Sequence, residues 1–359
     1  MVSVALPCCG RVARLATRRQ HESPTIGPVN GLKIGTIAAG ALLVAAVGYA
    51  LQNSGASIDG QSDRTAGGSL SALPVGPAAP DFAGITGWLN SPPLTLSALA
   101  GKVVLVDFWT YSCINCQRTL PELRAWWQAY HDRGLVIVGV HSPEFDFEKD
   151  PANVQRAVTE LGVTWPVALD PAMSTWNAYR NQYWPAEYLI DQQGRVRHQH
   201  FGEGAYDVTE KAIQALLGLS GRGVDASAQL PGIGITGEAY AGAARSDGRI
   251  SLNGAWSESP EYASSIAPGA AAEIDFTATN VYLVAGSDGA PATAQVTIDG
   301  RAPTPSEAGP AIHFDGSGRA LLTIGAHDLY AVLSLPSRQS HRLTVLFEAP
   351  VQLFTFTFG

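Results

Sequence analysis

Cysteine is scarce in this chain of 359 residues: only Cys8, Cys9, Cys113 and Cys116 are present. A small fold that depends on disulfide bonds needs more cysteines than this, so the disulfide-rich class is excluded. The stability must come from apolar cores. Charge is sparse as well, because charged residues make up 15% of the sequence and the net charge is -8. No basic stripe is present beyond the N-terminal tail. A nucleic-acid partner needs a basic face, and this class of partner is therefore excluded.

Charge is absent altogether from Ile34 to Leu51. As a helix this run spans about 27 Å, close to the ~30 Å hydrocarbon core of a bilayer. We therefore predict a transmembrane anchor over residues 32–52, with the basic residues 1–31 in the cytoplasm and everything downstream extracytoplasmic. Secretion after cleavage of a signal peptide is the alternative, with Ser54 and Ala56 as small residues at the cleavage site. We favour the anchor because the apolar run and the preceding tail are long; both interpretations export the rest of the chain.

The remaining sequence divides by composition and pattern. Residues 53–79 are rich in Gly, Ser, Ala and Pro, which predicts a flexible linker. Residues 80–219 alternate predicted strands and helices, which indicates a mixed central sheet with helices on both faces. A linker over residues 220–234 leads to residues 235–359, where short alternating runs between turns predict an all-β jelly-roll sandwich. In the α/β part we expect strands at 103–108, 135–141, 165–169, 186–191 and 195–201, and helices at 119–130, 153–161, 173–180 and 208–217.

Short alternating runs recur in residues 235–359 between Gly, Pro and Asp turns. We expect strands at 272–278, 281–285, 294–298, 319–324, 329–335 and 342–348. The final run, Phe354-Thr-Phe-Thr-Phe358, places three phenylalanines on one face of a strand and two threonines on the other.

The stretch from Val103 to Cys116 carries the chemistry. Its β-branched and apolar residues predict a buried strand, and Cys113 and Cys116 follow where a helix should begin. Residues three apart lie on the same side of a helix, so the two sulfurs can meet. The helix dipole would lower the pKa of Cys113 and make its thiolate available as a nucleophile. This pattern indicates thiol–disulfide exchange.

These residues resemble the thioredoxin superfamily. The resemblance consists of a strand, an acid, a tryptophan, a C-x-x-C pair and a proline in the same order, as Val106-Asp107-Phe108-Trp109-x-x-x-Cys113-x-x-Cys116 with Pro121. Ala79-Pro80-Asp81-Phe82 and Leu99-Ala100-Gly101-Lys102 are similar to the exported, membrane-tethered TlpA-like branch.

Longer stretches resemble the extracytoplasmic part of DipZ-type proteins, in which a thioredoxin-like domain is followed by a carbohydrate-binding-module-like sandwich. They are Trp109-Thr-Tyr-Ser-Cys-Ile-Asn-Cys-Gln-Arg-Thr-Leu-Pro121, Gln182-Tyr-Trp-Pro-Ala-Glu-Tyr-Leu-Ile-Asp191 and the closing Phe-Thr-Phe-Gly359. The resemblance covers residues 80–359.

The resemblance implies a role for each residue of the pair and for the acid behind it. Cys113 is expected to be the exposed attacking thiolate, and Cys116 the resolving thiol that breaks the mixed disulfide. Asp107 matches the buried acid of the family. Desolvation would raise its pKa and fit it to take the proton from Cys116. An aspartate that only binds backbone at the strand end is the alternative.

Trp184-Pro185 matches the family's loop that faces the cysteines, where the proline is cis and the preceding backbone receives the substrate chain. A trans proline at the start of a strand is the alternative. The predicted substrate-binding residues are thus Trp184, Ser112 and Trp109, with Trp109 acting as a packing wall. Ser112, Trp184 and the Ile114-Asn115 dipeptide depart from ordinary thioredoxin, so the substrate and the direction of electron flow stay open.

No metal site and no cofactor are predicted. His198 and His200 share one face of a strand, but a third ligand at suitable spacing is missing, which favours a solvated or packing pair. A zinc knuckle needs a second cysteine pair on the same side of the membrane. Copper binding by the thiolates of Cys113 and Cys116 stays a minor alternative, because thiolates suit Cu(I).

We predict a membrane-anchored, extracytoplasmic thiol–disulfide oxidoreductase that reduces disulfides in exported proteins, with electrons from a separate CcdA-like or DsbD-like membrane partner. If it acts as an oxidant, a quinone-linked partner takes that place. The alternative is a binding protein whose sandwich recognises glycan or a partner protein, with the cysteines as a redox switch or a copper-thiolate site. Trp256, Tyr262 and Tyr282 are the candidate aromatics for stacking on sugar rings, although packing is the favoured interpretation.

Overall fold

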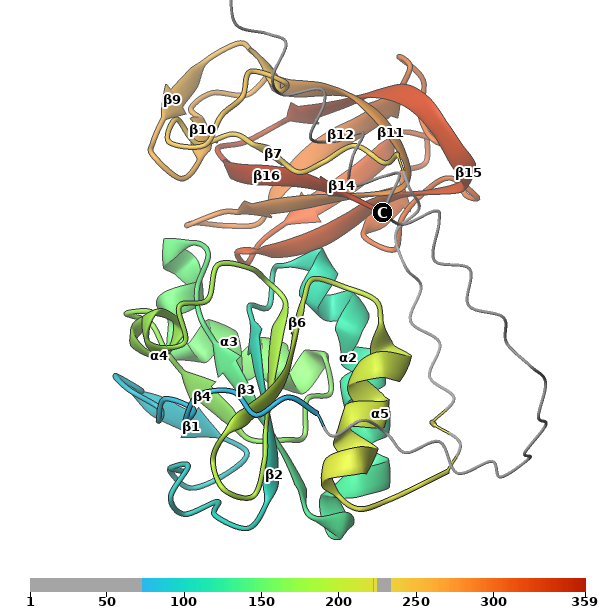
Figure 1. Ribbon diagram of the computed structural model, residues 1–359. Helices are drawn as coiled ribbons and strands as arrows, with labels where there is room; N and C mark the ends of the chain where they lie inside the picture. The colour runs from blue at the N-terminus through green and yellow to red at the C-terminus, as the bar shows by residue number, and fades with distance from the viewer. Residues whose placement is uncertain (1–72, 222, 225–233) are drawn as a thin grey trace, which may run out of the picture. The chain divides into compact units, whose positions relative to one another are not determined.

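A six-stranded mixed sheet forms the first part of the computed structural model, which describes residues 73–221, 223–224 and 234–359 (Figure 1). The strand order is β1-β4-β3-β2-β5-β6. The strands are Gly87–Leu89 (β1), Val103–Trp109 (β2), Leu135–His141 (β3), Val167–Leu169 (β4), Ala186–Ile190 (β5) and Val196–Phe201 (β6). The helices are Ile114–Tyr130 (α2), Pro151–Glu160 (α3), Ser174–Ala178 (α4) and Tyr206–Leu216 (α5), with 3-10 turns at His131–Arg133 (η1) and Asp146–Lys149 (η2).

The pairing of these strands confirms the predicted mixed sheet. β2, β3 and β4 run parallel, whereas β5 runs antiparallel to β2 and β6 antiparallel to β5. The sequence did not predict β1, which pairs antiparallel with β4. Three residues are too few for an alternating pattern to be visible in a sequence.

Successive residues of β2 enter two different hydrophobic clusters. Val103 and Leu105 pack with residues of α2, α3 and α5, whereas Val104 and Phe108 pack with α4 and with residues 79–99. Every residue of β2 is buried, because both faces of the sheet are covered. The strand that leads into the cysteine pair is therefore the centre of this α/β domain.

The α/β domain begins earlier than predicted. Gly76 N–H donates to the Val196 carbonyl over 2.9 Å, and Val196 N–H donates to the Pro77 carbonyl over 3.0 Å. Residues 73–79, predicted to belong to the linker, are thus bound along β6. The physical reason is that β6 is an edge strand whose free backbone groups accept a partner of any composition.

The second domain is all-β and antiparallel, with strand order β13-β14-β12-β15-β11-β16-β10-β9, β7 paired with β16 and β8 with β11. This confirms the predicted all-β class, while the jelly-roll topology stays a prediction. The strands are Ala239–Tyr240 (β7), Ser251–Asn253 (β8), Trp256–Glu258 (β9), Ala263–Ser265 (β10), Ala270–Gly286 (β11), Ala292–Ile298 (β12), Ile312–Phe314 (β13), Ala320–Ile324 (β14), Asp328–Phe347 (β15) and Gln352–Phe358 (β16).

Two strands of this β-domain are longer than the sequence pattern suggests. β11 and β15 pair along most of their length and cross the predicted breaks. Register shifts between Ala278 and Asn280 and between Val281 and Tyr282 mark where the pairing is irregular. A bulge interrupts the alternation of side chains without ending the strand, so it resembles a turn in the sequence.

β16 departs from the predicted two-faced pattern. Phe356 and Phe358 enter the main core of the β-domain, but Phe354 joins a separate cluster with Phe145 of the α/β domain. The pairing with β11 shifts register next to Phe354, which turns this side chain away from the other two. Thr355 is also buried, and its hydroxyl donates to the Ala239 carbonyl over 2.8 Å.

All described residues belong to one compact unit. Direct contacts join the two domains, including an ion pair of 2.6 Å between Arg156 Nη1 and Asp328 Oδ2. In the part of the chain that the structure describes, no helix is long and apolar enough to cross a membrane. The predicted anchor at residues 32–52 lies outside the described residues.

Candidate active site

Cys113 is the residue that caps the N-terminus of α2. Its backbone is extended, and Cys116 N–H donates to its sulfur over 3.4 Å. Both cysteines are free thiols. The first turn of a 17-residue helix presents unpaired N–H groups and a partial positive charge to the Cys113 sulfur. This placement puts the Cys113 sulfur at the positive end of the helix dipole.

Cys113 was predicted to be exposed, and this is wrong for the residue as a whole, which is only 6% exposed. It lies at a cleft of about 440 Å³ that residues from both domains line. Trp184 and Asn115 come from the α/β domain, and Tyr240 and Arg245 from the β-domain. The motif around the cysteine carries no sign of the wall from the β-domain.

Cys116 is fully buried one turn inside α2. Burial raises the pKa of its thiol well above the usual range, and the Cys113 sulfur and the negative charge of Asp107 raise it further. A thiol in this environment does not ionise unaided near neutral pH. It needs a neighbouring base in order to react.

Asp107 lies directly across from Glu187 in the antiparallel pair β2–β5. Both side chains are almost completely buried. Burial raises the pKa of Asp107 to about 7 and that of Glu187 to about 8, and the Asp107 charge contributes to the second. Among the described residues, Asp107 Oδ1 and Glu187 Oε2 have no hydrogen-bond partner. Two close carboxyl groups in a dry site hold at least one proton between them near neutral pH.

Glu187 was not identified from the sequence. It lies two residues after Pro185, in a strand that otherwise reads as apolar. A charged residue in a buried strand is a usable signal, but only the register of β5 against β2 shows that it meets Asp107.

The Trp184–Pro185 peptide bond is cis, which confirms the prediction for this bond. Trp184 Nε1 donates to the Ser142 carbonyl over 2.9 Å, and its ring lies 4.1 Å from that of Trp176. These contacts fix the tryptophan, which lines the cleft together with Cys113.

Ser112 and Trp109 were predicted to belong to the substrate-binding residues, with Trp109 as a packing wall, and the structure buries both side chains. Ser112 is 2% exposed and donates its hydroxyl to Glu148 Oε1 over 2.6 Å. Trp109 is 1% exposed and packs edge-on against His141. Neither residue lines the cleft. The side chains of β2 alternate between two buried faces, so Trp109 enters the core, and the η2 segment covers Ser112.

Glu148 is a second buried carboxylate that the sequence did not reveal. Besides Ser112, it accepts hydrogen bonds from the N–H groups of Glu144 at 2.6 Å and Phe145 at 3.0 Å. It therefore ties the loop after β3 to the residue that precedes Cys113. Burial raises its pKa despite these bonds.

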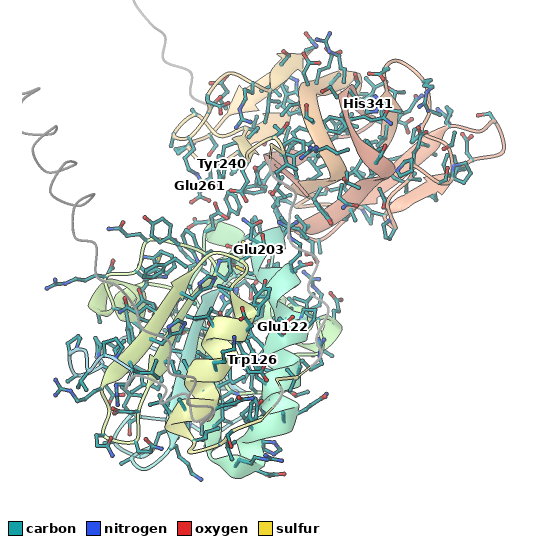
Figure 2. The ribbon with its side chains drawn as sticks, turned by 45° about the vertical axis from the view of Figure 1, so that its right-hand side comes forward. Glu122, Trp126, Glu203, Tyr240, Glu261 and His341 are labelled. Carbon is teal, nitrogen blue, oxygen red and sulfur yellow. The ribbon has the colours of Figure 1, made fainter. Side chains whose placement is uncertain are left out.

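The β-domain contacts the same loop. Tyr240 is labelled in Figure 2, and its hydroxyl donates to Glu144 Oε1 over 2.9 Å. Arg245 Nη1 donates to the same oxygen over 2.6 Å. The ring of Phe354 packs against Phe145 and Phe147 at centroid distances of 5.1 and 4.7 Å. The second domain thus supports the loop that covers the active site.

Other predicted residues have structural partners. His198 Nε2 lies 3.1 Å from Thr209 Oγ1 on α5. Within the described ranges, no group of three or more His, Cys, Asp or Glu is placed to hold a metal ion. The rings of Trp256 and Tyr262 pack against Phe347 and Phe354, which supports packing for these two aromatics.

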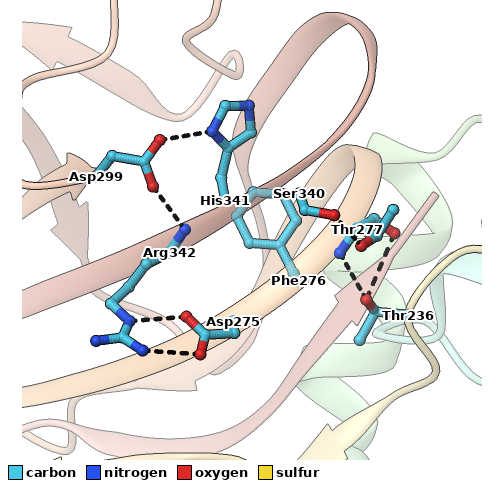
Figure 3. Close-up of a pocket in the computed structure, with 8 residues that line it drawn as sticks. All are labelled: Thr236, Asp275, Phe276, Thr277, Asp299, Ser340, His341 and Arg342. Carbon is cyan, nitrogen blue, oxygen red and sulfur yellow. Dashed lines mark hydrogen bonds and ion pairs between the residues drawn. The ribbon is translucent and has the colours of Figure 1, made fainter.

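The β-domain has a shallow pocket of its own, of about 610 Å³ (Figure 3). Its charged side chains already bind one another. Arg342 makes two bonds of 2.7 and 2.8 Å to Asp275, and His341 Nδ1 lies 2.7 Å from Asp299 Oδ2. These pairs leave little unmet hydrogen-bonding capacity for a ligand.

The fold and the site define a thioredoxin-like domain with a C-x-x-C pair, followed by an antiparallel β-domain. Residues 75–199 match the AhpC/TSA family, and residues 233–359 match the family described as thioredoxin like C-terminal domain. Each match covers about a third of the chain, and the two matches fall on the α/β domain and on the β-domain.

Individual proteins are similar to parts of this chain. The chain is 40% identical over 316 residues to Protein DipZ of Mycobacterium tuberculosis, which covers 78% of this chain and 43% of that protein. It is 29% identical over 138 residues to the thiol-disulfide oxidoreductase YkuV of Bacillus subtilis, covering 38% of this chain and 93% of the relative. The crystal structure of a putative thiol:disulfide interchange protein DsbE from Chlorobium tepidum is 30% identical, with 40% of this chain and 99% of that chain covered and a TM-score of 0.35. The chain thus spans less than half the length of DipZ.

Proposed function

We propose that this protein is an extracytoplasmic thiol–disulfide oxidoreductase that reduces disulfides in exported proteins. The observation that carries the proposal is the position of Cys113, at the N-terminus of α2 and at the cleft beside the cis Trp184–Pro185 bond. Cys116 lies behind it, and Asp107 and Glu187 form a buried acid pair on the adjoining strands.

The reaction is a sequence of two thiol exchanges. The Cys113 thiolate attacks one sulfur of the substrate disulfide, the substrate S–S bond breaks, and the other substrate sulfur leaves as a thiolate. Cys116 then attacks the Cys113 sulfur of this mixed disulfide, and the second substrate thiolate leaves. The dithiol loses two electrons and becomes a disulfide, the substrate gains them, and two protons pass to the two substrate thiols.

The acid pair serves the second exchange. Because the pKa of Cys116 is raised, its proton must go to a base before its sulfur can attack. Asp107, with a pKa raised to about 7, accepts this proton near neutral pH, and the charge that Asp107 carries raises the pKa of Glu187 across the strand pair. Asp107 thus acts as the general base, and Glu187 as a positioning residue.

The apolar run in residues 32–52 supports a membrane anchor with both domains outside the cytoplasm. In this setting we propose that electrons reach the cysteine pair from a membrane donor of the CcdA-like or DsbD-like kind. The same anchor keeps the domains close to that donor.

Trapping of mixed disulfides tests whether the protein exchanges disulfides with its substrates. Changing Cys116 to Ser should accumulate mixed disulfides through Cys113, whereas changing both cysteines should accumulate none. The absence of trapped species and of activity on a model disulfide would contradict the proposal. The reduction potential of the Cys113–Cys116 couple then shows the direction of electron flow. A value near the ~-270 mV of thioredoxin supports a reductant, and a value near ~-120 mV supports an oxidant.

A further inference from the structure

The cleft at the active-site cysteine has one wall from each domain. On the α/β side, the exposed rings of Tyr183 and Phe201 lie 5.5 Å apart and form an aromatic shelf. On the β-domain side, the lining residues are Glu238, Tyr240 and Arg245. A substrate that reaches the cysteine must therefore pass residues of the β-domain.

The β-domain wall is held in a fixed arrangement around Glu144. The Tyr240 hydroxyl lies 2.9 Å from Glu144 Oε1 and 2.7 Å from Glu238 Oε2. The Arg245 guanidinium, besides binding Glu144, lies 4.0 Å from the ring centroid of Tyr240 and 4.8 Å from that of Phe145. These contacts fix the carboxylates before a substrate arrives.

The charged groups that line the cleft, from both domains, do not balance. Two carboxylates, Glu144 and Glu238, and one guanidinium, Arg245, are the charged groups that line the cleft. The hydroxyl between the carboxylates has a single proton and cannot donate to both at once. Burial and the Glu238 charge raise the pKa of Glu144 to about 7, although Arg245 opposes this. When Glu144 is ionised, the cleft therefore carries one negative charge that Arg245 does not balance.

We propose that the cleft selects extended polypeptide segments in which a lysine or arginine lies within two residues of the reacting cysteine. The basic side chain pairs with Glu144 and Glu238 and balances the charge of the wall, while the aromatic shelf takes an apolar neighbour. This inference rests on the proposed function, because it names the substrate class of the same site. It gives the β-domain a part in choosing the substrate.

Disulfide-linked peptide dimers test the inference with the full-length protein. The peptides are identical except for one position that carries Lys, Gln or Glu and is moved from two residues before the cysteine to two residues after it. At the best position, kcat/KM for the Lys peptide should exceed that for the Gln peptide roughly 5- to 20-fold, with the Glu peptide slowest. The advantage should shrink as salt is added. Equal rates at every position, or a preference for Glu, overturn the inference.

One variant tests whether the preference for a basic residue depends on the β-domain side of the cleft. Glu238→Gln should reduce the Lys-over-Gln ratio to about twofold or less, because one of the two carboxylates is gone. Glu348→Gln removes an exposed carboxylate of the same domain outside the cleft and should keep the wild-type ratio. A full ratio in Glu238→Gln overturns the assignment. If the wild-type protein reduces none of the peptides, the proposed function itself fails, which distinguishes that failure from a loss of selectivity.

Discussion

Asp107 and Glu187 occupy directly opposed positions on β2 and β5, and both carboxyl groups are buried behind the cysteine pair. The charge of Asp107 acts on Cys116 and on Glu187 alike. In the mechanism we propose, a proton that leaves Cys116 enters a pair of coupled acids rather than a single one. We therefore expect the second exchange to be sensitive to pH near neutrality.

Glu187→Gln should slow the release of the substrate from the mixed disulfide about 3- to 10-fold at pH 7, because the coupled acid is lost while the side-chain volume is kept. The pH profile of this step should also change, since one fewer carboxyl group titrates between pH 6 and 9. Stopped-flow measurement of mixed-disulfide decay across this range checks the prediction.

Asp207→Asn is the matched control, because it removes an exposed carboxylate of α5 in the same domain. The mixed disulfide of this variant should decay at the same rate as that of the wild type. A Glu187→Gln profile that superimposes on that of the wild type would show that Glu187 only packs.

Asp107→Asn should raise stability at high pH. The folded-state pKa of Asp107 is about 7, above the usual 3.8, so its stabilising contribution is complete below pH ~4 and is lost as the pH rises through 7. The asparagine variant has no such loss, and its free energy of unfolding should exceed that of the wild type by about 1–3 kcal/mol at pH 8.5. Urea unfolding of the reduced proteins at pH 5.0, 7.0 and 8.5 measures the difference. A difference that does not depend on pH would contradict this assignment.

Glu148→Gln should destabilise the protein by about 2–4 kcal/mol, because its two oxygens accept hydrogen bonds from Ser112 and from the backbone of Glu144 and Phe145. Ser112→Ala removes a donor and leaves the backbone bonds, so the loss should be about 1 kcal/mol. Thermal unfolding of the two variants shows which substitution destabilises the protein more. The reverse order would indicate that the loop does not depend on Glu148.

Phe354→Ala should loosen the active-site loop, because its ring packs on Phe145 and Phe147 of that loop. We expect about 3–5 kcal/mol of destabilisation and faster amide hydrogen exchange in residues 142–149. Phe358→Ala is the control: the ring is equally buried, but it stacks on Phe276 within the β-domain. Similar exchange in the loop of both variants would argue against local support.

Much of the α/β domain was predictable, for reasons that lie in local sequence. β3 was predicted at its observed bounds and β2 to within one residue, because a strand buried on both faces shows as a continuous apolar run. The spacing of Cys113 and Cys116 at the start of a helix also follows from local pattern alone. The bulges in β11 and the flipped side chain of Phe354 did not, because a bulge changes the face of a residue without changing the composition.

The sequence by itself determined the kind of reaction, since two cysteines three apart after a buried strand identify a thiol-exchange site. Only the tertiary structure decided what surrounds that site. Strand register brought Glu187 opposite Asp107, and packing of the β-domain brought Tyr240 and Arg245 to the cleft. These partners are distant in sequence, and their proximity depends on long-range pairing and side-chain packing that no local pattern records.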